Sequence, residues 1–219
     1  MMLRFVRTES TFTELMYSAY INEVERYRAE IPLNFADVVA KFYHNTQVKY
    51  KLCHDGNERL RNMFKLDSSF VSNPFYILNS NDESVGYVFG KQTKSFWGGG
   101  YWYYEYDFCG CRYLAYSIGM GKEGIKIPIY VCNQGEQQIA LIEKDVAVYD
   151  NKDEYRIYAQ SESELEIAAL FNFYYDFVKF GNRSKLVYKT KKVEYIHSPK
   201  ILKDKYKPDF KLQCLGRRT

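Results

Sequence analysis

Two short cysteine-containing segments have residue types that could do chemistry. Residues 109–111 (Cys-Gly-Cys) place two thiols two positions apart, and thiolates are ligands that suit zinc. This spacing is tighter than that of usual zinc sites and no second cysteine pair is near, so a glycine turn flanked by half-buried residues is favoured. Residues 53–55 (Cys-His-Asp) contain a nucleophile, a base and an acid, but catalytic groups are assembled in space rather than by adjacency. We predict no metal, no cofactor and no enzymatic activity.

Carboxylates gather in two places. An acidic run at expected hairpin ends could do acid–base or metal work, although solvated turns explain it without further assumptions: Glu143, Asp145, Asp150, Asp153 and Glu154. Asp176 is different because it lies inside an apolar segment, where a carboxylate needs a partner or a shifted pKa. Lys179 and Asn172 are its neighbours on a helix. We expect a structural cluster where this polar stripe meets solvent or a gap in a barrel.

Trp97 and Trp102 flank three consecutive glycines. Tryptophan favours interfaces, so this loop could gate a ligand or touch a membrane. A hairpin whose aromatic side chains cover the end of a barrel is the favoured interpretation. The glycines do not match a phosphate-binding fingerprint, because no Lys-Ser/Thr pair and no strand-to-helix context follow them.

Basic charge is concentrated at the C-terminal end. Residues 181–219 hold 12 Lys/Arg against 3 Asp/Glu, whereas the remaining residues hold 19 against 24. Such a tail suits an acidic protein, an anionic membrane, where each lysine adds about 1 kcal/mol, or single-stranded nucleic acid. A solvated extension partly packed on its own domain is the alternative. The lysines predicted to contact a ligand are Lys185, Lys189, Lys191 and Lys192.

The bulk composition describes a globular chain with a real core. It has 219 residues, 46% of them hydrophobic, and its 22 tyrosines favour half-buried strands. Five cysteines are an odd number, and the first residues lack the apolar region of a signal peptide. We therefore expect free thiols in a cytoplasmic protein, at a membrane surface if the tail binds lipid, with no transmembrane segment.

Residues 161–181 are the segment around which the fold is expected to form. Ser161 and Glu164 make a capping box, and Gly181 suits a helix C-terminus. The helix is apolar nearly all round, and its roughly 24 Å length is short of the ~30 Å membrane core. We therefore expect protein to surround it. The pattern leaves open whether it packs under one sheet or is enclosed on all sides.

The rest of the chain divides into two patterns. Thr11 and Glu14 form a second capping box, apolar residues up to Tyr27 repeat at helical spacing and Pro32 ends the pattern, so residues 1–71 are expected to be mainly helical. From Pro74 onward, eight short strands alternate with turns before the apolar helix. A barrel needs a filled interior, and such a helix would fill it.

Three segments carry a resemblance to a known family. FYILNSNDESVGYVFG, YDFCGCRYLAYSI and QQIALIEKDVAVYDNKDEYRIYA, followed by the apolar helix, resemble the tubby C-terminal-like superfamily, which includes LURP-one-related proteins and phospholipid scramblases. The resemblance covers about residues 72–181. It implies an antiparallel barrel around a central helix and, from tubby, a phosphoinositide-binding module without catalytic activity. No match to tubby's lipid-contacting basic residues is present.

The sequence thus predicts an α+β protein with three parts. Residues 1–71 form a helical region, residues 72–181 a tubby-like antiparallel barrel around a helix at about 161–180, and residues 182–219 a basic extension. The predicted function is non-enzymatic binding of anionic phospholipid or phosphoinositide headgroups through the four lysines, with Trp97 and Trp102. A protein or nucleic-acid interaction through the same tail is the alternative.

Overall fold

The computed structural model describes residues 1–11, 13–32, 38–54, 74–93, 100–118, 128–144, 154–180 and 200–216. Within these residues, antiparallel strands close into one barrel in which each strand pairs with its neighbours in sequence and β1 pairs with β12. The strands are β1 (Met2–Ser10), β2 (Glu14–Ile21), β3 (Val24–Pro32), β4 (Val38–His44), β5 (Gln47–His54), β6 (Phe75–Asn79), β7 (Ser84–Gln92), β8 (Trp102–Phe108), β9 (Cys111–Ser117), β10 (Pro128–Cys132), β11 (Gln138–Lys144) and β12 (Glu154–Ala159).

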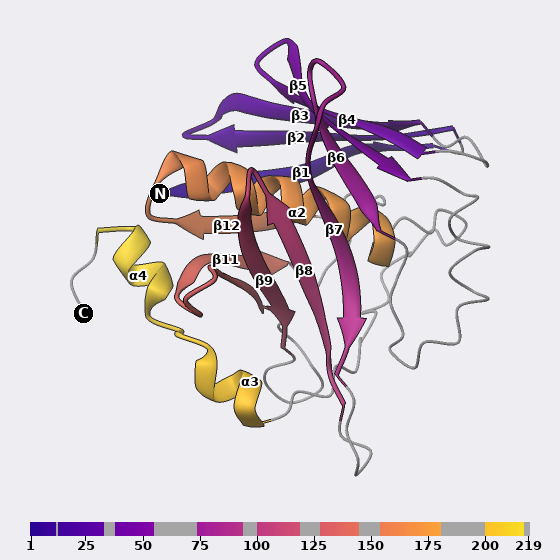
Figure 1. The fold of residues 1–219 in the computed structure, drawn as a ribbon. Coiled ribbons are helices and arrows are strands. Elements are labelled where there is room, and N and C mark those ends of the chain that lie inside the picture. The colour runs from indigo at the N-terminus through magenta and orange to yellow at the C-terminus, as the bar shows by residue number, and fades with distance from the viewer. Residues whose placement is uncertain are drawn as a thin grey trace, which may run out of the picture.

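The helix α2 (Glu162–Phe180) follows β12 and lies inside the barrel (Figure 1). Its buried side chains form one hydrophobic core with inward-facing residues of the surrounding strands. The ring of Phe173 contacts Tyr17 of β2, and the ring of Phe171 contacts Tyr104 of β8 on the other side. The helix is therefore enclosed on all sides rather than packed under one sheet.

The two sides of α2 are filled differently. Its backbone runs closest to β11 and β12. Residues four apart lie on the same face of a helix, and the face of α2 nearest these strands includes the buried Ala168 and Asn172. The facing strands carry the buried Ala140 and Ala159. Small side chains let the backbones approach on this side. Bulky aromatic side chains fill the wider space opposite.

The predicted helical N-terminal region is wrong, and with it the α+β class. Residues 1–54 contribute β1 to β5 to the same barrel as β6 to β12. In β2 the buried side chains Leu15, Tyr17 and Ala19 alternate, which is the two-residue period of a strand. Leu15 and Ala19 also fit a helical period, so the same residues satisfied both patterns. The predicted β-barrel itself is confirmed, with its wall extended to the N-terminus.

The two capping-box sequences adopt different structures. At Ser161 the box begins α2 as predicted, because the Glu164 amide donates to Ser161 Oγ and the Ser161 amide donates to the Glu164 carboxylate. At Thr11 the same pattern closes a turn between β1 and β2. The Glu14 amide donates to Thr11 Oγ1, and the Thr11 amide donates to the Glu14 carbonyl oxygen. The capping-box pattern, Ser or Thr followed three residues later by Glu, thus occurs at a hairpin turn as well as at the start of a helix.

Tight hairpins gather at the end of the barrel where α2 begins. We call this the turn end; it joins β2 to β3, β4 to β5, β6 to β7, β8 to β9 and β10 to β11. The described non-glycine residues with positive φ all lie in these turns: Asn22, Glu23, Asn45, Asp82, Cys109 and Glu136.

Two short helices cover part of the outer barrel surface. They are α3 (Lys200–Lys205) and α4 (Phe210–Cys214); α4 lies beside β11, and α3 lies below it in Figure 1. Leu202 of α3 is buried with Tyr116 and Tyr130, and Phe210 of α4 is buried with Leu141. None of the described helices is long and apolar enough to cross a membrane.

Candidate functional site

Most of the predicted ligand-binding residues lie outside the described part of the chain. This holds for the four lysines at positions 185, 189, 191 and 192 and for Trp97. Trp102 is described; it begins β8 and is 41% exposed. The predicted site can therefore be followed through Trp102 and through the described part of the basic tail, residues 200–216.

The described tail has an inner face and an outer face. Its inner face is apolar and buried on the barrel. Its exposed side chains include Lys200, Ile201, Lys203, Lys207 and Leu215, which we call the tail outer face, and also the carboxylates Asp204 and Asp209. Ile201 is 54% exposed and Leu215 is 42% exposed, which makes them two of the most exposed large apolar residues of the described chain. Exposed basic and apolar side chains therefore occur in the same short segment, together with two exposed carboxylates.

Polar contacts fix the tail helices to the barrel. Lys205 Nζ lies 2.7 Å from Glu136 Oε1, and Lys211 Nζ lies 2.7 Å from Glu143 Oε2. The Tyr130 hydroxyl donates to the Leu202 carbonyl oxygen over 2.9 Å. Two of the tail lysines are thereby neutralised by barrel carboxylates. No ion pair to a described carboxylate neutralises the three lysines of the tail outer face.

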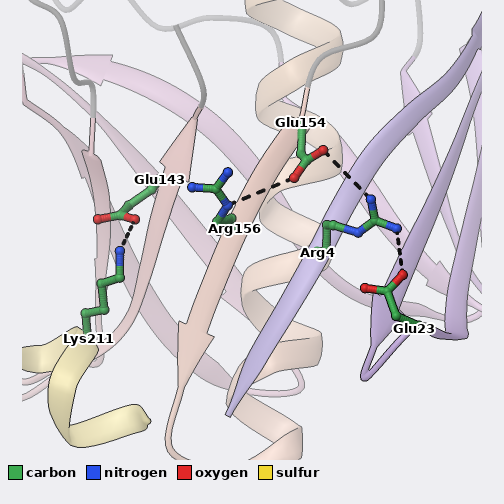
Figure 2. A network of polar contacts seen from close by, with 6 residues as sticks. All are labelled: Arg4, Glu23, Glu143, Glu154, Arg156 and Lys211. Atoms are coloured by element: carbon green, nitrogen blue, oxygen red, sulfur yellow. Dashed lines mark hydrogen bonds and ion pairs between the residues drawn. The ribbon is translucent and has the colours of Figure 1, made fainter. Parts of the chain in front are cut away.

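The neighbouring outer surface of the barrel carries charges of both signs (Figure 2). Arg4 of β1 contacts Glu23 at 3.0 Å and Glu154 at 3.9 Å, and Glu154 also lies 4.0 Å from Arg156. These cations are already paired, so this string of residues is a poor site for an anion. Two residues of the predicted acidic run lie on this surface. Glu154 and Glu143 each form an ion pair with a basic side chain, as expected for solvated positions. Asp145, Asp150 and Asp153 lie outside the described residues.

A buried ion pair joins α2 to the barrel wall. Asp176 is fully buried, and its Oδ2 accepts from Nε of Arg7 over 3.1 Å and from the Tyr17 hydroxyl over 2.8 Å. Arg7 Nη2 also donates to Oδ2, and the Tyr155 hydroxyl donates to Oδ1. These partners come from β1, β2 and β12. We call these residues the Asp176 centre.

The Asp176 centre corrects the predicted polar stripe. Asp176 pairs with Arg7 rather than with Lys179, which is exposed. Asn172 is fully buried, and neither of its amide atoms has a hydrogen-bond partner among the described residues. The stripe thus lies in the barrel interior and reaches solvent only at Lys179. Burial, followed by the negative charge of Asp176, raises the pKa of Tyr17 well above its usual value, which keeps this donor protonated.

A second polar contact of α2 lies at the turn end. Glu166 accepts from Lys49 Nζ over 2.7 Å and from the Tyr50 hydroxyl over 2.9 Å, both on β5. Its side chain is 14% exposed, so this contact borders solvent. Partial burial and then Glu166 raise the pKa of Tyr50. Neither Glu166 nor Lys49 was predicted from the sequence to have a role.

The Cys-His-Asp segment does not form a catalytic site. Cys53 and His54 are consecutive in β5, so their side chains project from opposite faces of the sheet. The His54 ring lies 4.9 Å from the ring of Phe75, which belongs to the core. Asp55 lies outside the described residues. The structure does not bring the Cys53 thiol and the His54 imidazole together.

The Cys-Gly-Cys segment forms the turn between β8 and β9, as predicted, but its cysteines are exposed rather than half-buried. Phe108 pairs with Cys111, which leaves Cys109 and Gly110 as a two-residue loop. Both have positive φ, 52° for Cys109 and 76° for Gly110. This is the geometry of a type I′ hairpin turn.

Comparisons with known proteins give no further guidance. No family model, no curated protein and no solved structure matches this chain. The site must therefore be argued from its own residues. Arg7 and Lys49 were missed because their partners on α2 follow 169 and 117 residues later. The sequence offered one signal for such a contact, which was Asp176, because a carboxylate inside an apolar helix needs a partner.

Proposed function

We propose that this protein is a non-enzymatic binding module for the anionic headgroups of phospholipids, and that the tail outer face takes part in binding. The observation that carries the proposal is the arrangement of residues 200–216. Their apolar side is used to dock on the barrel, which leaves three lysines exposed in the same segment as Ile201 and Leu215. Amphipathic surfaces of this composition bind at membrane interfaces, where lysines meet headgroups and apolar side chains enter the acyl boundary.

The basic charge of this surface extends along the sequence. Lys185, Lys189, Lys191 and Lys192 precede α3, and the segment from 181 onward has nine more positive than negative residues. Each lysine near an anionic surface contributes about 1 kcal/mol. The resemblance to the tubby-like superfamily supports a phosphoinositide as the headgroup, since a closed barrel around a helix is the architecture which that resemblance implies.

The docked aromatic residues favour lipid over single-stranded nucleic acid. Bases bind such proteins by stacking on exposed aromatic rings. In the described tail, Tyr206 lies 6.0 Å from the ring of Tyr130, and Phe210 is buried against the barrel. These rings serve docking and are not presented for stacking, whereas the lysines remain at the surface.

The test is vesicle co-sedimentation of matched charge-reversal variants of the full chain. Lys200→Glu/Lys203→Glu removes basic charge from the tail outer face. Arg26→Glu/Lys41→Glu makes the same change in net charge at exposed positions of β3 and β4. Vesicles of neutral lipid, and of neutral lipid with acidic phospholipid or phosphoinositide, are compared at two salt concentrations.

We expect binding to acidic vesicles only, released by salt. The tail variant should bind at least about 30-fold more weakly, because two lysines contribute about 2 kcal/mol. The β3–β4 variant should bind more nearly as the unaltered protein does. Equal weakening by both variants would mean that net charge alone drives binding. Absence of binding to acidic vesicles at low salt would overturn the proposal.

A further inference from the structure

The turn at residues 109–111 departs from its neighbours at the turn end. Positive φ strains most residues, and asparagine and aspartate tolerate it better than others. The five other described non-glycine residues with positive φ are Asn22, Asn45 and Asp82, which are of the tolerant types, and Glu23 and Glu136, which are not. Cys109 occupies the position where type I′ hairpins prefer Asn or Asp. A cysteine there costs stability that a common turn residue would not, and such outliers indicate a function.

The surroundings of the turn leave two exposed thiols, one on each side of Gly110 in the sequence. Cys109 and Cys111 are both exposed. A side chain added at Gly110 would meet nothing within 4 Å, so the space beside the loop is open. Tyr113, which follows on β9, is the nearest described tyrosine along the chain.

The number of ligands selects the kind of ion. Among the described residues, no three His, Cys, Asp or Glu side chains gather closely enough to hold a metal ion. Zinc takes four ligands in structural sites, so a thiol pair alone is insufficient for it. Soft thiolates select Cu(I), which accepts two sulfur ligands. We propose that Cys109 and Cys111 form a two-coordinate site for Cu(I), presented on the β8–β9 turn.

The binding step releases protons. One Cu⁺ replaces the protons of two thiols, giving a bis-thiolate complex of charge −1 and two H⁺. A cysteine thiol has a reference pKa of about 8.5 and is mostly protonated at neutral pH, so Cu(I) must displace its proton. The apparent affinity for Cu(I) should therefore fall as the solution becomes more acidic.

The test is Cu(I) titration of the full chain against a chromophoric Cu(I) chelator, without oxygen and with a thiol-free reductant. Cys109→Asn is the central variant, because asparagine suits the turn and the fold should be kept. Cys111→Ser removes the second ligand. Cys53→Ser is the control, since it removes a thiol on β5 that is not exposed. Circular dichroism checks the fold of each variant.

We expect one Cu(I) per chain for the unaltered protein and for Cys53→Ser, and loss of that Cu(I) in both Cys109→Asn and Cys111→Ser. Retention of the ion by a folded Cys109→Asn/Cys111→Ser protein would overturn the proposal. Zinc binding tighter than Cu(I) binding at the same cysteines would also overturn it, because further ligands would then have to complete a tetrahedral site.

Discussion

The two carboxylates of α2 make similar contacts in different surroundings. Each accepts hydrogen bonds from a tyrosine hydroxyl and from a basic side chain on the barrel wall. Asp176 is fully buried, with Arg7 and two tyrosines around it, whereas Glu166 is 14% exposed beside a lysine that is 37% exposed. From this difference we expect burial, rather than the pattern of hydrogen bonds, to decide how much each contact contributes to the free energy of unfolding.

A buried ion pair gains little over a well-packed apolar pair, but losing one partner leaves a charge without compensation. At the Asp176 centre, water cannot replace a missing partner. At Glu166, solvent can reach the carboxylate and the ammonium. Both contacts fix the position of α2 along and around its axis. Only at the Asp176 centre should the loss of a single partner strongly destabilise the folded protein.

The largest effect is expected from Arg7→Leu. It leaves the Asp176 carboxylate buried without its cation, and we expect a loss of about 3–5 kcal/mol in the free energy of unfolding. Urea unfolding measures this loss. The control is Arg7→Leu/Asp176→Leu, which should recover part of the loss because no charge remains unpaired. A single variant as stable as the unaltered protein would contradict the assigned role of the pair.

An intermediate effect is expected from alkaline pH. The pKa of Tyr17 is raised in the folded protein, whereas unfolded tyrosine has a pKa of about 10. The unfolded chain therefore loses this proton first, so the stabilisation is complete below about pH 10 and declines as the pH rises above it. At about pH 11 the loss is about 1.4 kcal/mol for one such buried tyrosine.

Urea unfolding near pH 8 and near pH 11 measures this dependence. Tyr17→Phe should remove its share of the decline. Tyr50→Phe should also remove a share, because partial burial and Glu166 raise the pKa of Tyr50 as well. A decline that Tyr17→Phe leaves unchanged would contradict the raised pKa of Tyr17.

The smallest effect is expected from Glu166→Gln. The amide keeps an acceptor for the Tyr50 hydroxyl and removes only the ion pair with the partly exposed Lys49. We expect a loss of about 1 kcal/mol or less, and less still at high salt. Thermal unfolding at two salt concentrations measures it. A loss as large as that of Arg7→Leu would show that the turn end is not open to solvent.

The sequence indicated the interior of this fold better than its wall. The apolar run after Ser161 predicted a helix in contact with protein, although the pattern left open whether one sheet or a whole barrel surrounds it, and the alternation after Pro74 predicted strands. The first strands were misread because Leu15, Ala19 and Tyr27 fit a helical period, while the alternating Tyr17 was not weighed. Side-chain periodicity over one short strand cannot separate these cases when the residues are small or aromatic.

The candidate sites were less predictable for a related reason. Asp176 indicated that a cation must lie near, but nothing in the pattern selected Arg7 over Lys179, because the closure of β1 on β12 places Arg7 there. Docking of residues 200–216 on the outer surface depends equally on side chains such as Tyr116 and Leu141, which are distant in sequence. The spacing of hydrophobic residues identifies helices and strands, whereas the sites depend on contacts between residues that are distant in the sequence.

The pairing of β1 with β12 has a consequence for how the protein folds during synthesis. Leu3 pairs with Ile157, which is synthesised about 150 residues later. At a synthesis rate of 5–20 residues per second, the first strand therefore emerges roughly 8–30 s before its partner. During that interval, an unpaired strand edge is available to other nascent chains. The non-local pairing of β1 with β12 also predicts that closure of the barrel is slow. The last strand and α2 must arrive nearly together, so a chain truncated before them exposes an unfilled apolar interior and is expected to depend on chaperones.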